Sequence, residues 1–281
     1  MTPKGTLYIV ATPIGNLEDI TLRALKILKQ VGLIAAEDTR HTRKLLHAYG
    51  IDVPLTSLYD QNELKKSALI ISKLTAGTDV AYVSDAGTPG ISDPGYILIN
   101  QAIDHSITVV PVPGPSAVVA ALSASGMPMD SFVFLGFLPT RQGKKIHLLE
   151  SLKNESHTMV FYESPRRLVP TLHTMSDIFG DRTAVIAREL TKLYEEIIRG
   201  TLSDIIAGLA ERDIKGEITI IIAGAQEETD VDPTEAIKTR LAELAADHTL
   251  STRDIVTTIA EETGLPRKLV YKKVLELRKE C

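Results

Sequence analysis

Residues 84–95 carry the side chains and backbone best suited to hold a ligand. The segment reads Ser-Asp-Ala-Gly-Thr-Pro-Gly-Ile-Ser-Asp-Pro-Gly, with three glycines and two prolines in twelve residues. Glycine lets a backbone approach a ligand closely, and proline reduces the entropy that a loop loses on ordering. Asp85 can accept hydrogen bonds from ligand hydroxyls or an ammonium group, although an aspartate at such a place also caps turns. The density of glycine and proline favours the ligand-binding interpretation.

Two further loops share this character. Residues 11–16 read Ala-Thr-Pro-Ile-Gly-Asn, and residues 111–117 read Pro-Val-Pro-Gly-Pro-Ser-Ala. The second loop opens a predicted helix, so Ser116 offers a hydroxyl and a free amide at a helix N-terminus. Because ligands bind at the carboxyl ends of parallel strands, the three loops are expected to converge on one cleft. Each loop taken alone can also be only a stiff connection.

The elements that position these loops are short apolar runs alternating with segments of helical period. An Asp19 or Thr21 cap would start the first helix, in which Leu or Val recurs every third residue from 22 to 31. The pattern predicts strands at residues 7–11, 33–36, 79–83, 107–110 and 131–135, and further helices at residues 39–49, 62–76, 94–105 and 115–125. Strands alternating with helices predict an α/β fold with a largely parallel sheet.

The second half of the chain alternates apolar runs with segments of helical period less regularly. It predicts strands at residues 158–162, 183–187, 195–199 and 217–223, and helices at residues 166–178 and 202–211. Residues 139–145, Pro-Thr-Arg-Gln-Gly-Lys-Lys, are typical of a connecting loop. Proline and glycine crowd between residues 111 and 130, which predicts a first α/β domain at 1–115 and a second at 116–225.

A small helical domain is predicted at residues 234–281. It follows residues 226–233, which contain four acidic and no basic side chains, and comprises predicted helices at 234–246, 251–262 and 266–280. The last two, joined through Gly264, resemble a helix-turn-helix. The final helix has six basic and two acidic residues, which is either a nucleic-acid-binding feature or a solvated face that packs on the main body.

The composition excludes several classes of protein. The 281 residues are 44% hydrophobic and 24% charged, which excludes a disordered chain, and the net charge of −5 argues against a bulk-basic nucleic-acid binder. The single cysteine, Cys281, excludes an internal disulfide framework and a cysteine-based zinc site, so a cytoplasmic location is expected. No apolar run is long enough to span a bilayer, and the first apolar run is expected to be a strand rather than a signal peptide.

Several common catalytic motifs are also missing. The sequence has no phosphate-binding G-x-x-x-x-G-K-[ST], no G-x-G-x-x-G after the first strand, no H-x-x-x-H pair and no G-x-S-x-G elbow. A nucleotidase of the P-loop type, a standard dinucleotide fold and a zincin-type metal site are therefore not supported, and no metal is expected.

Six strings together resemble the tetrapyrrole-methylase superfamily, in particular its bacterial branch that methylates the 2′-hydroxyl of a cytidine in small-subunit ribosomal RNA. They lie at residues 11–16, 37–40 (Glu-Asp-Thr-Arg), 84–95, 113–117, 161–166 (Phe-Tyr-Glu-Ser-Pro-Arg) and 188–192 (Arg-Glu-Leu-Thr-Lys). The resemblance implies S-adenosylmethionine as methyl donor, two α/β domains with the donor in the cleft between them, and a homodimer. Many tetrapyrrole methylases carry G-x-G-x-G after the first strand and Gly-Asp-Pro in the second loop. This chain has neither, which argues against a tetrapyrrole substrate.

The resemblance also implies which residues hold the donor. Ile14 would line the pocket floor, and Asp85 with the backbone of Gly87 and Thr88 would hold the methionine or ribose portion. The remaining implied donor contacts are Ser116, Ala117, Tyr162 and the strand end at Ala223.

Methyl transfer to a ribose hydroxyl needs an in-line arrangement and a group that removes the hydroxyl proton. Glu163, Glu189 and Asp38 are the candidate bases, since each is expected at or just beyond a strand end, with an arginine nearby in sequence. Glu163 is the first choice. The alternative for each is a structural ion pair.

Three clusters of cations could hold RNA phosphates, which would position the substrate without specifying its sequence. They are Arg40, Arg43 and Lys44; Arg141, Lys144 and Lys145; and Arg166 and Arg167. The expected partner is small-subunit ribosomal RNA or the assembled small subunit, with no membrane. Two alternatives remain open: a methylase of a tetrapyrrole or other small molecule on the same fold, and a regulator that senses a ligand and binds DNA through its C-terminal helices.

Overall fold

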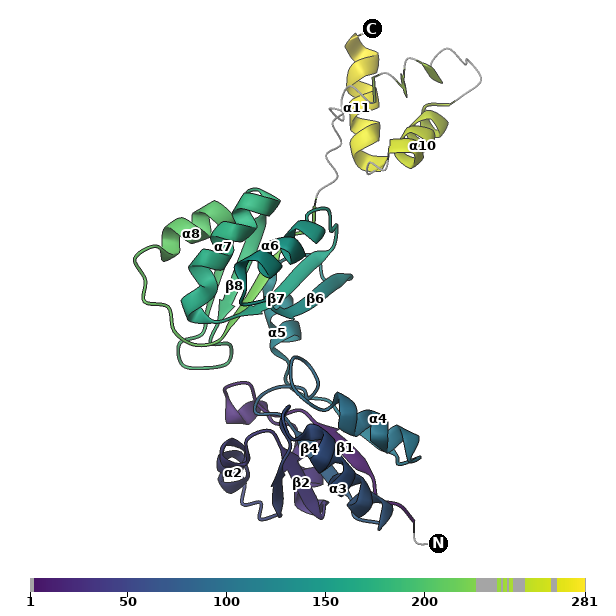
Figure 1. Cartoon of the computed structure of the whole chain (residues 1–281). Coiled ribbons are helices and arrows are strands. Elements are labelled where there is room, and N and C mark those ends of the chain that lie inside the picture. The colour runs from purple at the N-terminus through teal and green to yellow at the C-terminus, as the bar shows by residue number, and fades with distance from the viewer. Residues whose placement is uncertain are drawn as a thin grey trace. The chain divides into compact units, whose positions relative to one another are not determined.

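The computed structural model describes residues 3–225, 237–238, 240–241, 243–244, 251–263 and 267–280, with side chains up to residue 276. The chain divides into two compact units, Met1–Ala225 and Gln226–Cys281 (Figure 1). No helix in the described ranges has both the length and the apolar character needed to cross a membrane.

A parallel five-stranded sheet forms the first half of the larger unit. Its strand order is β3-β2-β4-β1-β5. The strands are β1 (Leu7–Val10), β2 (Leu33–Ala36), β3 (Leu55–Ser57), β4 (Val80–Val83) and β5 (Val109–Val112). The central strands β2 and β4 are buried along their whole length because helices cover both faces, as parallel sheets require.

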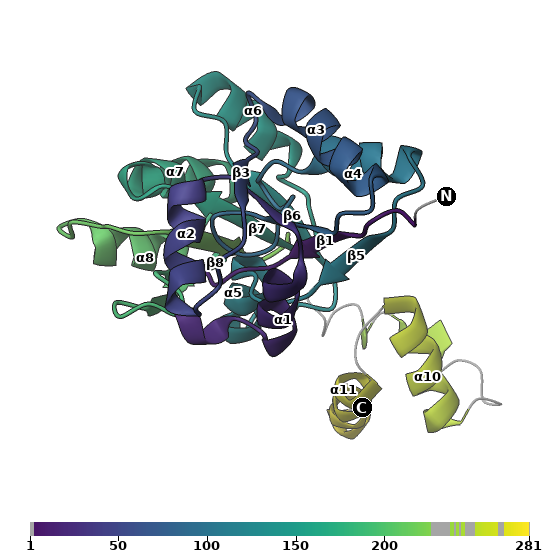
Figure 2. The same ribbon diagram turned by 90° about the horizontal axis from the view of Figure 1, so that it is seen from below.

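Two pairs of helices form these layers. Alternate residues of a strand face opposite sides of the sheet, so Ile34 packs toward α1 (Leu22–Gln30) and α2 (Thr39–Ala48). The neighbouring Ala35 packs toward α3 (Glu63–Thr75) and α4 (Tyr96–Asp104), which lie side by side in Figures 1 and 2. The cap of α1 is Thr21, whose hydroxyl accepts the Ala24 N–H at 3.1 Å, while Asp19 ends the short helix η1 (Leu17–Asp19).

The second sheet is mixed. Its order is β6-β7-β10-β8-β9, with β6 parallel to β7 and every other pair antiparallel. The strands are β6 (Phe132–Phe137), β7 (Thr158–Glu163), β8 (Thr183–Arg188), β9 (Glu196–Thr201) and β10 (Ile218–Ile222). One face packs on α6 (Gln142–Ser151), α7 (Pro165–Phe179) and α8 (Leu202–Leu209), and the other packs on α5 (Ala117–Ser125). The prediction of largely parallel strands therefore holds for the first sheet only.

Three local predictions need correction. The segment 139–145 is not wholly a loop, because α6 begins at Gln142. The side chains of Lys145 and Leu149 on this helix are buried in the core. The short strand β3 was not predicted, since its three residues, Leu-Thr-Ser, carry little apolar pattern. The strand β6 extends to Phe137, past a register shift between Phe134 and Gly136.

The smaller unit has a hydrophobic core of its own. Its described helices are α10 (Thr252–Thr263) and α11 (Arg267–Glu280), and they bury Ile255, Ile259, Val270 and Val274 with Ile237 and Leu241. The sequence predicted both helices closely. The predicted helix at 234–246 lies largely outside the described residues.

Candidate functional site

The three proline- and glycine-rich loops meet at one edge of the first sheet. Thr12 and Gly87 exchange two backbone hydrogen bonds, of 2.9 and 3.0 Å. The Thr88 hydroxyl reaches the third loop and donates to the Pro115 carbonyl at 3.2 Å. Gly87 has a φ of +78°, which disfavours any side chain, and a Cβ there would lie 3.4 Å from the Ile14 side chain. The expected convergence of these loops is present.

A cavity of about 400 Å³ opens where these loops face the second sheet. Its size lies within the range of small-molecule sites. It is lined by Ile14, Glu37, Asp85, Ala86, Gly87, Thr88, Ile91, Ser92, Asp93, Ser116, Ala117, Phe137, Tyr162, Glu163, Ser164, Pro165, Ala187, Leu190, Gly216, Glu217, Ile218 and Thr219. Seven of the eight residues predicted to hold a donor are in this lining: Ile14, Asp85, Gly87, Thr88, Ser116, Ala117 and Tyr162.

Ala223 is the exception. The strand β10 runs antiparallel to β7, so its first residues, Ile218 and Thr219, border the cavity. Ala223 lies past the opposite end of β10, where its N–H donates to the Thr183 carbonyl at 3.0 Å. The sequence predicted the strand β10 but not the direction in which it runs. The residues from Gly216 to Thr219, which line the cavity at the start of β10, were therefore not predicted as site residues.

The N-terminus of α5, at the end of the third loop, and an aromatic cluster of the second sheet form one wall of the cavity. Ser116 is the N-cap of α5, yet its hydroxyl makes no capping bond, so this hydroxyl is free to meet a ligand. The Val118 N–H points to the Tyr162 hydroxyl, and burial raises the pKa of Tyr162 to about 12. The ring of Tyr162 contacts Phe134 and Phe137, with centroids 5.1 and 5.5 Å away. This wall offers aromatic rings beside hydrogen-bonding groups.

The three candidate bases are all engaged in ion pairs. Glu163 accepts from the Ser164 N–H at 2.7 Å, Arg167 Nε at 2.6 Å and the Thr171 hydroxyl at 2.8 Å, and its side chain has no exposed surface. Asp38 caps α2 and pairs with Arg40 at 2.7 Å, and this bond holds the pKa of Asp38 well below its usual range.

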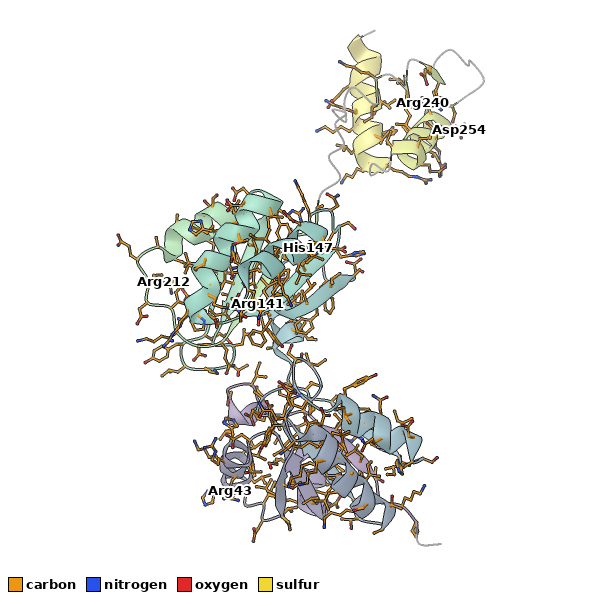
Figure 3. All side chains as sticks on the ribbon, viewed as in Figure 1. Arg43, Arg141, His147, Arg212, Arg240 and Asp254 are labelled. Atoms are coloured by element: carbon orange, nitrogen blue, oxygen red, sulfur yellow. The ribbon has the colours of Figure 1, made fainter. Side chains whose placement is uncertain are left out.

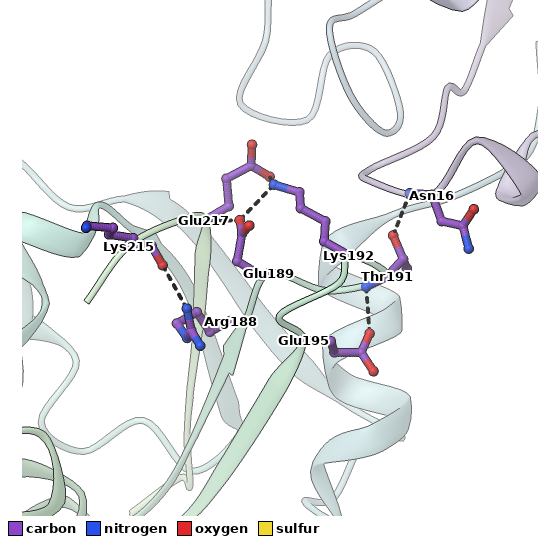
Figure 4. A network of polar contacts seen from close by, with 8 residues as sticks. All are labelled: Asn16, Arg188, Glu189, Thr191, Lys192, Glu195, Lys215 and Glu217. Carbon is purple, nitrogen blue, oxygen red and sulfur yellow. Dashed lines mark hydrogen bonds and ion pairs between the residues drawn. The ribbon is translucent and has the colours of Figure 1, made fainter. Parts of the chain in front are cut away.

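Glu189 lies in the loop between β8 and β9, which Figure 4 shows reaching the first sheet's loops. Burial disfavours its charge, but Lys192 at 2.8 Å and the Glu217 N–H at 3.0 Å outweigh that effect and lower its pKa. In the same loop the Thr191 hydroxyl accepts the Asn16 N–H at 3.0 Å, which ties the two halves of the unit together beside the cavity. Asp38 and Glu189 lie outside the cavity lining, and Glu163 is inside it.

The cavity also contains three carboxylates that the sequence did not predict to lie together. Glu37, Asp85 and Asp93 all line it, and none of them pairs with a lysine, arginine or histidine among the residues described. Burial, then the charge of Asp85, raises the pKa of Glu37. Burial, then the charge of Glu37, raises the pKa of Asp93 to about 6. Both residues belong to the strings at 37–40 and 84–95, so sequence reasoning had the right segments but not these side chains.

The cation clusters divide between surface and interior. Six of the predicted RNA contacts are exposed: Arg40, Arg43, Lys44, Arg141, Lys144 and Arg166. Figure 3 shows Arg43 on the first sheet's side of the unit and Arg141 at the start of α6.

The other two predicted contacts have structural partners. Lys145 is only 7% exposed and lies 3.4 Å from the Thr171 hydroxyl, and burial lowers its pKa. Arg167 bonds to Glu163 and to the Leu138 carbonyl. Helix geometry explains the difference, since α6 and α7 direct these two side chains toward the sheet.

The family of the chain follows from comparison with known proteins. A family model described as Tetrapyrrole (Corrin/Porphyrin) Methylases matches residues 6–206. The chain belongs to the tetrapyrrole methylase family. Curated relatives named "Ribosomal RNA small subunit methyltransferase I" match nearly from end to end. The one from Synechocystis is 46% identical over 97% of this chain and 98% of its own, and the one from Escherichia coli O157:H7 is 43% identical over 97% and 96%.

Solved structures of other proteins share the fold of this tetrapyrrole methylase. A conserved hypothetical protein from Aeropyrum pernix has a TM-score of 0.63 at 17% identity, covering 99% of this chain and 97% of its own. A uroporphyrin-III C-methyl transferase from Thermus thermophilus, complexed with S-adenyl homocysteine, has a TM-score of 0.56 at 17% identity, covering 78% and 97%. At these identities the likeness shows the fold alone.

Proposed function

We propose that this protein transfers a methyl group from S-adenosylmethionine to the ribose 2′-oxygen of a cytidine in small-subunit ribosomal RNA. The observation that carries the proposal is the identity of 42–46% with relatives named for small-subunit ribosomal RNA methylation, over both α/β halves and the C-terminal unit. The fold by itself does not select the substrate, because its structural neighbours include a uroporphyrin methylase.

The chain's own residues suit the proposed donor. The free hydroxyl of Ser116 and the first amides of α5 can bind a carboxylate, and Asp85 can accept from ribose hydroxyls or an ammonium group. The rings of Tyr162 and Phe137 offer a surface on which an adenine can lie. When bound, the donor supplies an electrophilic methyl group on a sulfonium sulfur. The protein's contribution is to hold the ribose hydroxyl in line with that carbon and to exclude water.

The exposed cations supply the RNA-binding part of the proposal. Arg43, Lys44, Arg141, Lys144 and Arg166 make no ion pair with any described residue, so they are available to phosphates. Arg40 is exposed too, but it is already paired with Asp38. Phosphate contacts of this kind make binding sensitive to salt. We also propose that the protein forms a homodimer, which would double the cationic surface, and light scattering of the purified chain tests this. We further propose that it acts in the cytoplasm.

Methyl transfer to purified small subunits tests the proposed function. Subunits from cells that lack this protein are incubated with methyl-labelled S-adenosylmethionine, and the RNA is digested to nucleosides. We expect one labelled product, 2′-O-methylcytidine. Label on a base carbon or nitrogen would contradict the proposed chemistry. A parallel reaction with deproteinised RNA decides whether the substrate is naked RNA or the assembled particle.

A further inference from the structure

The cavity holds three carboxylates that no described cation neutralises, and they differ in what they bond. Asp85 accepts the Asp38 N–H at 2.9 Å, and Glu37 accepts a backbone hydrogen bond from Asp85. Among the described residues, the Asp93 carboxylate interacts with the Ser84 hydroxyl, whose single proton can instead be donated to the Ala86 carbonyl at 3.3 Å. Of the three, Asp93 therefore has the carboxylate most available to a substrate.

The backbone just after Asp93 is firmly held. The buried Tyr82 hydroxyl donates to the Pro94 carbonyl at 2.7 Å, and the Gly95 N–H donates to the buried Glu63 carboxylate at 2.9 Å. Ser92, just before Asp93, has a positive φ of 64°, a conformation that residues other than glycine seldom adopt. These contacts fix the direction in which the Asp93 side chain leaves the loop, as a catalytic group requires.

We propose that Asp93 is the general base that removes the proton from the attacking ribose hydroxyl; this inference rests on the proposed function. The O–H bond breaks and its proton passes to the Asp93 carboxylate. The oxygen electron pair forms the new O–C bond to the methyl carbon while the C–S bond breaks, and the electrons of that bond remain on sulfur. Asp93 then returns its proton to water, so the carboxylate is regenerated and the step is balanced.

The surroundings of Asp93 suit this task. The charged groups that face it are Glu37 at the end of β2, Asp85 after β4 and Asp60 beyond β3. The tyrosines Tyr82 of β4 and Tyr162 of β7 also interact with its charge. With a pKa of about 6, Asp93 is ionised at neutral pH yet holds a proton better than an ordinary aspartate.

The primary test compares Asp93→Asn with the matched control Asp52→Asn, an exposed aspartate outside the cavity. We expect D93N to lower kcat by about 10²–10⁴-fold. Binding of S-adenosylmethionine, measured by calorimetry, should persist in D93N, and D52N should behave as wild type. Asp93→Glu, which restores a carboxylate, should recover part of the lost rate.

The dependence of kcat on pH distinguishes a catalytic role of Asp93 from a purely structural one. Wild-type kcat should fall as pH drops through about 6, the pKa of Asp93. Glu37→Gln removes a like charge, so it should shift the midpoint of this fall to lower pH.

A second readout does not depend on activity. The pKa of Asp93 is raised from 3.8 to about 6, so the native state binds the proton more tightly than the unfolded chain within that window. Stability contributed by this group therefore falls as pH rises from about 4 to about 6. The melting temperature of D93N should exceed that of wild type increasingly across the same window.

The outcomes separate the two proposals. A D93N enzyme that keeps more than about a tenth of wild-type kcat overturns the role of Asp93. So does a wild-type profile that is flat through pH 6, or a D93N melting difference that does not change with pH. Wild-type protein that methylates no cytidine in small subunits overturns the proposed function instead.

Discussion

At the scale of single residues, the carboxylates around the cavity differ in whether a cation neutralises them. Glu163 has Arg167 at 2.6 Å and a threonine hydroxyl at 2.8 Å, whereas Asp93 has one hydroxyl partner. Sequence indicated Glu163 as the base because it follows a strand and precedes arginines. The alternative of an ion pair was also open, and only the fold shows that Thr171, two helical turns later, completes the set of donors.

Glu163→Gln is predicted to be a stability variant. Removing the charge leaves Arg167 and the buried Lys145 without their carboxylate, which should lower the free energy of unfolding by about 3–5 kcal/mol. Urea denaturation measures this loss. Glu150→Gln, an exposed glutamate on α6, is the matched control and should change stability by less than about 0.5 kcal/mol. A Glu163→Gln enzyme as stable as wild type but inactive would restore Glu163 as the base.

At the scale of elements, the start of α4 holds the end of the loop at residues 84–95 in place. Gly95 has a φ of +129°, and a Cβ there would come within 2.6 Å of the buried Tyr82 ring. Three backbone N–H groups around the start of α4 donate to the Glu63 carboxylate from α3. This arrangement couples the end of the 84–95 loop to the core of the first sheet.

Gly95→Ala should therefore destabilise the protein, by about 1–3 kcal/mol for the overpacking alone, and reduce methyl transfer because Asp93 moves. Gly143→Ala is the contrasting change. Gly143 lies in α6 with no atom near its missing Cβ, so alanine should stabilise the helix by up to about 1 kcal/mol. Thermal unfolding of both variants compares the two effects. Equal changes would show that the contact with Tyr82 has no energetic consequence.

The same elements show how much of the fold could be predicted from the sequence. The alternation of strands and helices predicted the parallel first sheet, because each buried strand there is a continuous apolar run. The direction of β10 was not predictable, since an apolar run carries no sign of which neighbour it pairs with. The early start of α6 was missed because Gly143 and Pro139 are typical of loops, and burial of Lys145 and Leu149 outweighs that local preference.

At the scale of the whole molecule, the two units have separate cores. The described part of the smaller unit packs Ile255, Ile259 and Val274 together, and Arg240 pairs with Glu262. The positive charge expected of α11 is partly neutralised, because Lys273 pairs with Glu276. The net attraction of this helix for RNA should thus be weaker than its count of basic residues indicates.

Truncation after Ala225 tests what the smaller unit contributes. All cavity-lining residues lie before that point, so calorimetry should find S-adenosylmethionine binding unchanged. Affinity for small-subunit RNA should fall at least about tenfold, and its dependence on salt should become shallower because fewer phosphates are contacted. The exposed cations of the larger unit should preserve residual, salt-sensitive binding. Complete loss of nucleic-acid binding, with donor binding intact, would instead favour a regulator that reads nucleic acid through its C-terminal helices.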